Sequence, residues 1–175
     1  MIKGEDGDDV ISGGIGNDTI NAGNGDDWIE SGLGNDVVDG NAGNDIIYGG
    51  DGDDDIRGSN GNDAIYGGGG KDTLNGGADN DVIHGGDAED FIDGALGDDI
   101  LYGDSGNDKI YGNRGNDKIY GGIGDDAILG NLGNDVIYGG EGNDNIDGNQ
   151  DNDVLYGEEG DDQIRVGNIG QWAKA

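Results

Sequence analysis

Residues 40–66 read GNAGNDIIY GGDGDDDIR GSNGNDAIY when they are spaced into nines. Each block of nine has Asp at its sixth place and Ile at its eighth. The first and third blocks end in Tyr48 and Tyr66, whereas the middle block ends in Arg57. A short repeated unit therefore governs this stretch, and neighbouring units differ in a regular way.

The nine-residue frame runs from Gly4 to Arg165 without insertion or deletion and gives 18 units. Position 1 is Gly in 16 units, position 4 is Gly in 15, position 6 is Asp in all 18, and position 8 is always Ile, Leu or Val. The Gly, Asn and Asp of positions 1–6 tolerate tight turns and positive φ. Side chains alternate along a strand, so positions 7–9 form a short strand with position 8 facing inward. A disordered linker would not keep this register.

The composition is that of a chain that needs a cationic partner in order to fold. Forty acidic residues against eight basic ones give a formal charge of −32, and only 31% of residues are apolar. Such a chain cannot bury enough apolar surface to offset the entropy of ordering. The charge disfavours nucleic acid and anionic membrane as partners, and no apolar run is long enough to span a membrane. The absence of cysteine excludes disulfides and thiolate metal sites.

Alternate units differ in three positions. We call the units that begin at 4, 22, 40 and onward odd, and those that begin at 13, 31, 49 and onward even. Six of the seven tyrosines lie at position 9 of odd units, position 7 is apolar in eight of nine odd units, and position 2 is Gly in seven even units but two odd ones. Two units therefore make one coil of a parallel β-roll solenoid with two short-stranded sheets. Nine coils at the spacing of parallel strands give a length of about 43 Å.

Stacking of coils aligns the position-6 aspartates in two columns, one along each edge. The odd column is Asp9, Asp27, Asp45, Asp63, Asp81, Asp99, Asp117, Asp135 and Asp153, and the even column is Asp18, Asp36, Asp54, Asp72, Asp90, Asp108, Asp126, Asp144 and Asp162. Carboxylates about 5 Å apart repel by roughly 1 kcal/mol per pair even in water. Carboxylate and backbone carbonyl oxygens suit Ca²⁺, while Mg²⁺ demands a stricter octahedron. Zn²⁺ prefers His or Cys ligands, and the chain has one histidine and no cysteine. We therefore predict calcium in both columns.

The unit resembles GGxGxDxUx, the nonapeptide of the RTX (repeats-in-toxin, hemolysin-type) calcium-binding family. The best match is GGIGNDTIN at 13–21, followed by GGIGDDAIL at 121–129. The resemblance implies a parallel β-roll with Ca²⁺ between successive turns of one edge, bound by the position-6 Asp of both turns and by carbonyls of positions 1–4. Eight gaps on each edge then give about 16 ions. The resemblance also implies a secreted, extracellular protein that stays unfolded at low cytosolic calcium, passes a type I secretion channel and folds outside.

A few units depart from the pattern. Asp79 and Asp151 replace Gly at position 4, where Asp tolerates a left-handed backbone. The unit GGDAEDFID at 85–93 lacks both the position-4 Gly and the position-5 Asn or Asp, and we expect the weakest calcium site there. Lys71 places a cation beside the even column, which is harmless if the side chain points to solvent.

The other motifs do not indicate catalysis. GGGGKD at 67–72 has Asp72 where a phosphate-binding loop needs Ser or Thr, and NDNIDG at 143–148 is the nonapeptide read out of frame. His84 is the single histidine and falls among the tyrosines, where a solvated or stacked ring is the expected role. A uniform array does not bring unlike groups to one point, so we predict no enzyme activity in this chain.

The odd units carry a possible interaction face. Its residues are Trp28, Tyr48, Tyr66, Tyr102, Tyr120, Tyr138 and Tyr156. In-register aromatic rings stack and stiffen a sheet. The same rings, with the aliphatic residues of position 7, also form a flat apolar patch. A neighbouring domain, a second copy of the roll or a glycan could dock there, which is an adhesive or self-assembly function.

The repeat suggests three segments. Residues 1–3 are a lead-in, residues 4–165 form the roll, and residues 166–175 form a short tail whose Ile169 and Trp172 could partly cap the last coil. The N-terminal MIKGEDGDDV lacks the apolar core of a signal peptide. The parent protein, its cargo domain and the oligomeric state stay open.

Overall fold

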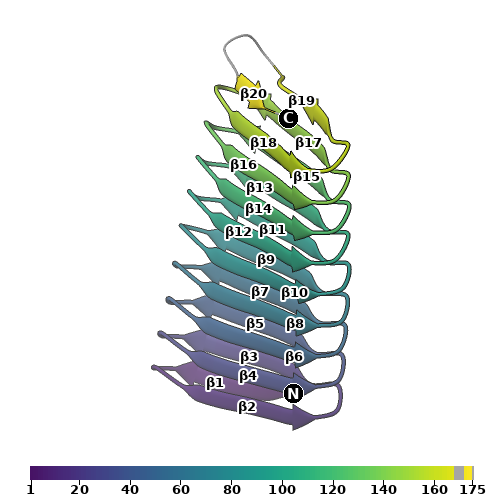
Figure 1. Cartoon of the computed structure of the whole chain (residues 1–175). Coiled ribbons are helices and arrows are strands. Elements are labelled where there is room, and N and C mark those ends of the chain that lie inside the picture. The colour runs from purple at the N-terminus through teal and green to yellow at the C-terminus, as the bar shows by residue number, and fades with distance from the viewer. Residues whose placement is uncertain (168–171, 175) are drawn as a thin grey trace.

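The chain forms a stack of β-coils. A computed structural model describes residues 1–167 and the backbone of 172–174. Within these residues all regular structure is β, and the twenty strands alternate between two parallel ten-stranded sheets. The coils rise in sequence order from the N-terminal end of the stack to the C-terminal end (Figure 1). The predicted all-β parallel solenoid of about nine 18-residue coils is confirmed.

The odd-numbered strands form one sheet, in chain order. They are β1 (Ile2–Asp6), β3 (Thr19–Asn24), β5 (Val37–Ala42), β7 (Asp55–Asn60), β9 (Thr73–Ala78), β11 (Phe91–Leu96), β13 (Lys109–Arg114), β15 (Ala127–Leu132), β17 (Asn145–Gln150) and β19 (Gln163–Arg165). The even-numbered strands form the other. They are β2 (Val10–Ile15), β4 (Trp28–Leu33), β6 (Ile46–Asp51), β8 (Ala64–Gly69), β10 (Val82–Asp87), β12 (Ile100–Ser105), β14 (Lys118–Ile123), β16 (Val136–Glu141), β18 (Val154–Glu159) and β20 (Trp172–Lys174).

The register places residues one coil apart side by side. In the pairing of β6 with β8, Ile47 lies opposite Ile65 and Tyr48 opposite Tyr66, an offset of 18 residues. The pairing of β5 with β7 has the same offset and sets Asp39 opposite Arg57. Tyr48 and Arg57 therefore belong to different sheets, which explains why the middle block of 40–66 ends differently.

Position 8 supplies the core. Its side chains from Ile11 to Leu155 are buried, most of them completely, while Ile164 in the last coil is partly buried. One aliphatic side chain per strand fills the narrow space between the sheets. Because the position-7 and position-9 neighbours face outward, the two sheets can differ on their outer faces while sharing one core.

The turns depend on left-handed backbone at position 4. Glycines occupy this conformation in most units, for example Gly52 at φ 136°. Asp79 and Asp151 adopt it at φ 77°, so the turns survive both substitutions. Ala88 also adopts it, at φ 84°. A Cβ in this region costs about 1–2 kcal/mol, and alanine has no polar side chain that could offset the cost.

The ends of the roll differ from the predicted segments in detail. β1 begins at Ile2 and pairs with β3, so the lead-in joins the sheet. β20 pairs with β18. Ile169 lies outside the described residues, and the side chain of Trp172 is not described, so the predicted cap stays a prediction.

The strain at position 4 yields a first prediction. Replacing Ala88 with Gly should raise the free energy of unfolding by about 1 kcal/mol, since it removes the Cβ penalty at positive φ. Denaturant unfolding in excess calcium measures this. Ala127→Gly, in strand β15, is the control and should lower stability by about 0.5–1 kcal/mol. Destabilisation by both variants would contradict the strain argument.

Candidate metal centre

The position-6 aspartates form two continuous columns, one at each edge of the stack. Each Asp comes immediately before an outward strand residue, at the corner where a turn ends. Fifteen of the eighteen side chains, from Asp27 and Asp36 to Asp144 and Asp153, are at most 3% exposed. Asp9, Asp18 and Asp162 belong to the end coils and are partly exposed. The fold therefore brings together carboxylates that lie 18 residues apart.

One carboxylate oxygen is used by the backbone of the neighbouring coil. The Asp63 N–H donates to Oδ1 of Asp81 at 2.8 Å, and the Asp45 N–H donates to Oδ1 of Asp63 at 2.8 Å. The even column repeats this pattern, as in Asp54 N–H to Asp72 Oδ1 at 2.9 Å. Each such bond bridges one gap between coils. The repeat did not predict these bonds, because stacking geometry alone decides which oxygen faces an N–H.

The other oxygen, Oδ2, is buried without a hydrogen-bond partner in fifteen of these residues. They are Asp9, Asp27, Asp36, Asp45, Asp54, Asp63, Asp72, Asp81, Asp90, Asp99, Asp108, Asp117, Asp126, Asp135 and Asp144. Leaving a buried acceptor unsatisfied costs about 1–3 kcal/mol, and more if it is charged. An unpaired oxygen that recurs from the first coil to the eighth therefore points to a proton or a bound cation.

The position-1 glycines leave room for these oxygens. A Cβ placed on Gly49 would lie 2.6 Å from Asp54 Oδ2 and 2.5 Å from the carbonyl oxygen of Gly67. A Cβ on Gly85 would meet Asp90 Oδ2 at 2.6 Å and the Gly103 oxygen at 2.8 Å. A carboxylate oxygen and a carbonyl oxygen of the next coil thus approach the same small space. Two acceptors repel there unless something positive lies near both.

Burial changes the acidity of the columns. It raises the pKa of Asp81 from its ordinary 3.8 to about 8, an effect reduced by the Asp63 N–H bond and reinforced by the charges of Asp63 and Asp99. Burial likewise raises the pKa of Asp63 and of Asp117 to about 7. Without a cation, the folded columns therefore favour bound protons near neutral pH.

The donor set fits calcium. Each edge offers one carboxylate per coil together with carbonyl oxygens, and within the described residues no His or Cys side chain belongs to the columns. Nor do three His, Cys, Asp or Glu side chains converge anywhere in the described residues so that they could hold a metal ion by themselves. This agrees with a site in which backbone carbonyls supply many of the ligands, as Ca²⁺ accepts and Zn²⁺ does not. The position-6 carboxylates are the side chains that could hold the ion.

A second, exposed ladder flanks each column at position 5. Asp26 Oδ1 accepts both the backbone N–H of Asn44 at 2.7 Å and its side-chain N–H at 3.1 Å. Lys71 interrupts the ladder on the even edge. Its ammonium, which is largely exposed, forms an ion pair with Glu89 of the next coil. Lys71 thus points away from the buried column, and two departures from the repeat neutralise each other.

The comparisons with known proteins agree with this geometry. The model of the RTX calcium-binding nonapeptide repeat (4 copies) matches residues 3–38, 30–65, 66–101, 93–128, 102–137 and 129–164. The chain belongs to the RTX calcium-binding nonapeptide repeat family. The RTX repeat therefore spans almost the whole roll, as its sequence resemblance predicted. No curated protein sequence matches the chain significantly.

The RTX chain is also similar to a solved structure. This is a hyperactive, Ca²⁺-dependent, β-helical antifreeze protein from an Antarctic bacterium, with 27% sequence identity and a TM-score of 0.51. The alignment covers 91% of this chain and 70% of that chain. Among the residues described, no helix is long and apolar enough to cross a membrane.

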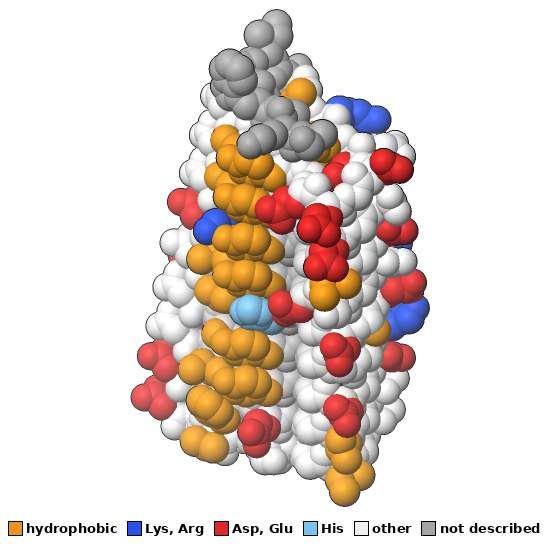
Figure 2. All heavy atoms as spheres, in the orientation of Figure 1, with side chains coloured by type: hydrophobic (Ala, Val, Ile, Leu, Met, Phe, Trp, Pro, Cys, Tyr) orange, Lys and Arg blue, Asp and Glu red, His pale blue; other side chains and the backbone are white. Residues whose placement is uncertain are grey.

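The predicted interaction face forms one stack of rings, which we call the tyrosine ladder. It runs Trp28, Tyr48, Tyr66, His84, Tyr102, Tyr120, Tyr138, Tyr156 along the even-numbered strands. Ring centroids from Tyr48 onward are 4.3–5.2 Å apart and nearly parallel. Figure 2 shows the resulting apolar stripe, with His84 as the pale blue break. Ring faces contact each other, so the ladder presents mainly edges and hydroxyl groups.

His84 has a partner that the repeat did not reveal. Its Nδ1 lies 3.0 Å from Oδ2 of Asp104, which occupies a position-2 site at φ 69°. The ring stacks between Tyr66 and Tyr102. The expected stacked role of His84 thus describes its geometry, and Asp104 fixes the orientation of the ring.

The raised pKa values of the column aspartates predict a pH dependence with a definite sign. A folded-state pKa above the ordinary value means that folding takes up protons. The calcium-free fold should therefore be most stable near pH 4 and should lose stability as pH rises through about 6 to 8. Far-UV circular dichroism in calcium-free buffer measures this as β structure that is gained on acidification.

Two triple variants separate burial from overall charge. Asp63→Asn, Asp81→Asn and Asp99→Asn together should move the loss of β structure to higher pH. The exposed set Asp26→Asn, Asp53→Asn and Asp98→Asn removes the same charge and should have a smaller effect. Equal shifts would mean that net charge alone, and not burial of position 6, sets the pH dependence.

Proposed function

We propose that this chain is a calcium-binding structural module that folds when Ca²⁺ enters both aspartate columns. The single observation that supports this most is the row of buried Oδ2 atoms that lack a hydrogen-bond partner. All eighteen position-6 aspartates are the proposed side-chain ligands, across residues 4–165. About 16 ions would fill the gaps between coils.

The coupling to folding follows from how the sites are built. Ligands of one site come from neighbouring coils, so a site exists only when coils are stacked. Binding free energy then becomes folding free energy, as in other metal-dependent small domains. The formal charge of −32 opposes stacking in the absence of ions. Calcium-free chains should therefore be expanded at neutral pH, and calcium-bound chains should be rigid rods.

This coupling suits a secreted protein. The RTX family and the Ca²⁺-dependent structural neighbour both support use of calcium. A chain that folds only at the millimolar calcium of extracellular fluid would remain unfolded during export through a type I channel. We propose an extracellular location within a larger parent protein, and a structural role in place of catalysis.

A calcium titration tests the proposal. Far-UV circular dichroism and analytical ultracentrifugation at neutral pH should report a cooperative gain of β structure together with a fall in hydrodynamic radius. The Asp63→Asn, Asp81→Asn and Asp99→Asn triple variant should need several-fold more calcium, because the four consecutive gaps between Asp45 and Asp117 each lose at least one charged ligand. A chain that folds identically in excess chelator would contradict the proposal.

The exposed triple variant at Asp26, Asp53 and Asp98 serves as the matched control. It carries the same net charge as the buried triple variant, yet it leaves the position-6 oxygens in place. Its calcium midpoint should stay within about twofold of the original chain, which is the range expected of surface electrostatics. A midpoint shift equal to that of the buried set would indicate a diffuse ionic atmosphere in place of bound ions.

The tyrosine ladder offers a second candidate function, adhesion or self-assembly. The observation in its favour is the aromatic and aliphatic stripe on the face drawn in Figure 2, which only His84 interrupts. Against it, the ring faces are already used within the ladder. We propose that the ladder mainly stiffens its sheet, and that any adhesive contact uses ring edges and hydroxyl groups.

Replacing Tyr48 and Tyr66 with Ser distinguishes the two roles. A stiffening role predicts that the variant remains in the association state of the original chain but loses about 1–2 kcal/mol of stability, from one stacked pair and its neighbours. Tyr111→Ser, on the other sheet, is the control for loss of an aromatic side chain. If sedimentation showed that the double variant alone had lost self-association, adhesion would be the primary role.

A further inference from the structure

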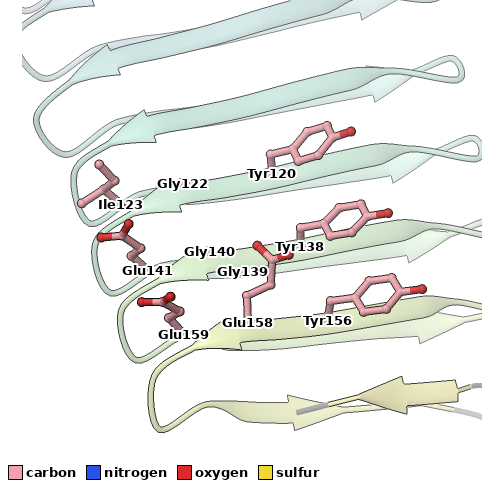
Figure 3. A pocket seen from close by; sticks show the side chains of 10 residues that line it. All are labelled: Tyr120, Gly122, Ile123, Tyr138, Gly139, Gly140, Glu141, Tyr156, Glu158 and Glu159. Carbon is pink, nitrogen blue, oxygen red and sulfur yellow. The ribbon is translucent and has the colours of Figure 1, made fainter.

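A groove of about 690 Å³ lies beside the C-terminal half of the tyrosine ladder. One wall consists of Tyr120, Tyr138 and Tyr156, and Gly140 lies in the floor (Figure 3). The floor is bare because position 2 has left-handed backbone, which favours Gly, as at Gly140 with φ 116°. The groove thus follows directly from the 18-residue pattern.

The opposite side of the groove is acidic. Glu141 and Glu159 are register partners on β16 and β18, and Glu158 lies opposite Gly140. All three glutamates are exposed, and no basic residue among the described side chains of residues 1–167 lines the groove. Glu158 holds the left-handed conformation at φ 74° where the two preceding coils have Gly. A carboxylate therefore stands in the groove despite a backbone cost of about 1–2 kcal/mol.

A single metal ion does not fit this arrangement. The three glutamates are not placed as a metal-holding group within the described residues. In Figure 3, Glu141 and Glu159 lie along the outer side while Glu158 stands nearer Tyr138. Their negative charge is spread along the groove, which suits a cation whose charges are spread likewise.

The tyrosine wall suits an alkyl ammonium. On the other side of the ladder, the Lys118 ammonium already lies over the Tyr120 ring, 5.0 Å from its centroid. Because the ring faces are stacked within the ladder, an ammonium in the groove would meet the tyrosine hydroxyl oxygens, which can accept its N–H groups, and the ring edges. Aromatic and apolar surface also covers methylene groups. A ligand with ammonium groups joined by short alkyl spacers would satisfy both walls at once.

We infer that this groove binds a linear polyamine. Register-paired Glu141 and Glu159 are one coil step apart, about 4.8 Å, a separation that a short alkyl spacer between two amines can match. Lysines on one side of an extended peptide are about 6.8 Å apart, because alternate side chains face opposite ways. The spacing thus favours the polyamine over a basic peptide. The site is separate from the calcium columns, whose position-6 aspartates do not line it.

Isothermal titration of the full chain with spermidine, in saturating calcium, tests the inference. Affinity should fall about fivefold or more when Glu141 and Glu159 are both replaced by Gln, since two ion pairs are lost. These glutamates are exposed, so the fold should persist, which circular dichroism checks. Spermidine should also bind more tightly than pentalysine at equal ionic strength.

The matched control is Glu30→Gln with Asp51→Asn. It removes the same charge from exposed positions of the same sheet, outside the groove. The control should bind spermidine like the original chain. An equal loss in both variants would reduce the effect to general attraction by an acidic surface and overturn the inference. Absent binding, or tighter binding of pentalysine, would overturn it as well.

Discussion

The structure depends on how buried carboxylates are neutralised. Each coil places one Asp at each edge; where a coil precedes it, Oδ1 accepts an N–H from that coil, and in fifteen of the aspartates Oδ2 is buried without a hydrogen-bond partner. The hydrogen bond and the unpaired oxygen have opposite effects: the first holds coils in register, and the second makes stacking unfavourable until a proton or cation arrives. The proposed dependence of folding on calcium rests on this opposition.

Much of this could be predicted from the sequence, because the repeat is strict. Invariant aliphatic residues identified the core, and the alternation of Tyr48, Arg57 and Tyr66 identified the two-unit coil. The different roles of Oδ1, which accepts a backbone N–H, and Oδ2, which is buried without a hydrogen-bond partner, could not be predicted. The two oxygens of a carboxylate are equivalent in sequence and differ only once coils stack. The pairs Lys71–Glu89 and His84–Asp104 were also missed, because each joins positions that the repeat treats as unrelated.

Five departures from the repeat lie near the middle of the stack. Lys71, His84, Ala88, Glu89 and Asp104 lie within three adjacent coils. Each would be unfavourable alone. Lys71 is a cation beside the even aspartate column, His84 interrupts the tyrosine ladder, and Ala88 has a Cβ at positive φ. Two of them are balanced by a partner in the next coil, whereas Ala88 is not. The fold tolerates substitution where a neighbour 18 or 20 residues away can respond, and stores strain where none can.

The 18-residue period allows the outer faces of the two sheets to differ while the aspartate columns at both edges stay the same. A strict nine-residue period would make the two faces identical. Both edges must repeat every nine residues, because every gap between coils faces the same electrostatic problem. The outer faces are free to differ, since positions 7 and 9 of odd units lie in one sheet with position 2 of even units, and the converse set lies in the other sheet. One face can then gather tyrosines beside a glycine floor, as at Tyr138 and Gly140, without disturbing a single position-6 Asp. Recognition can therefore evolve on the faces while the carboxylate columns stay fixed at the edges.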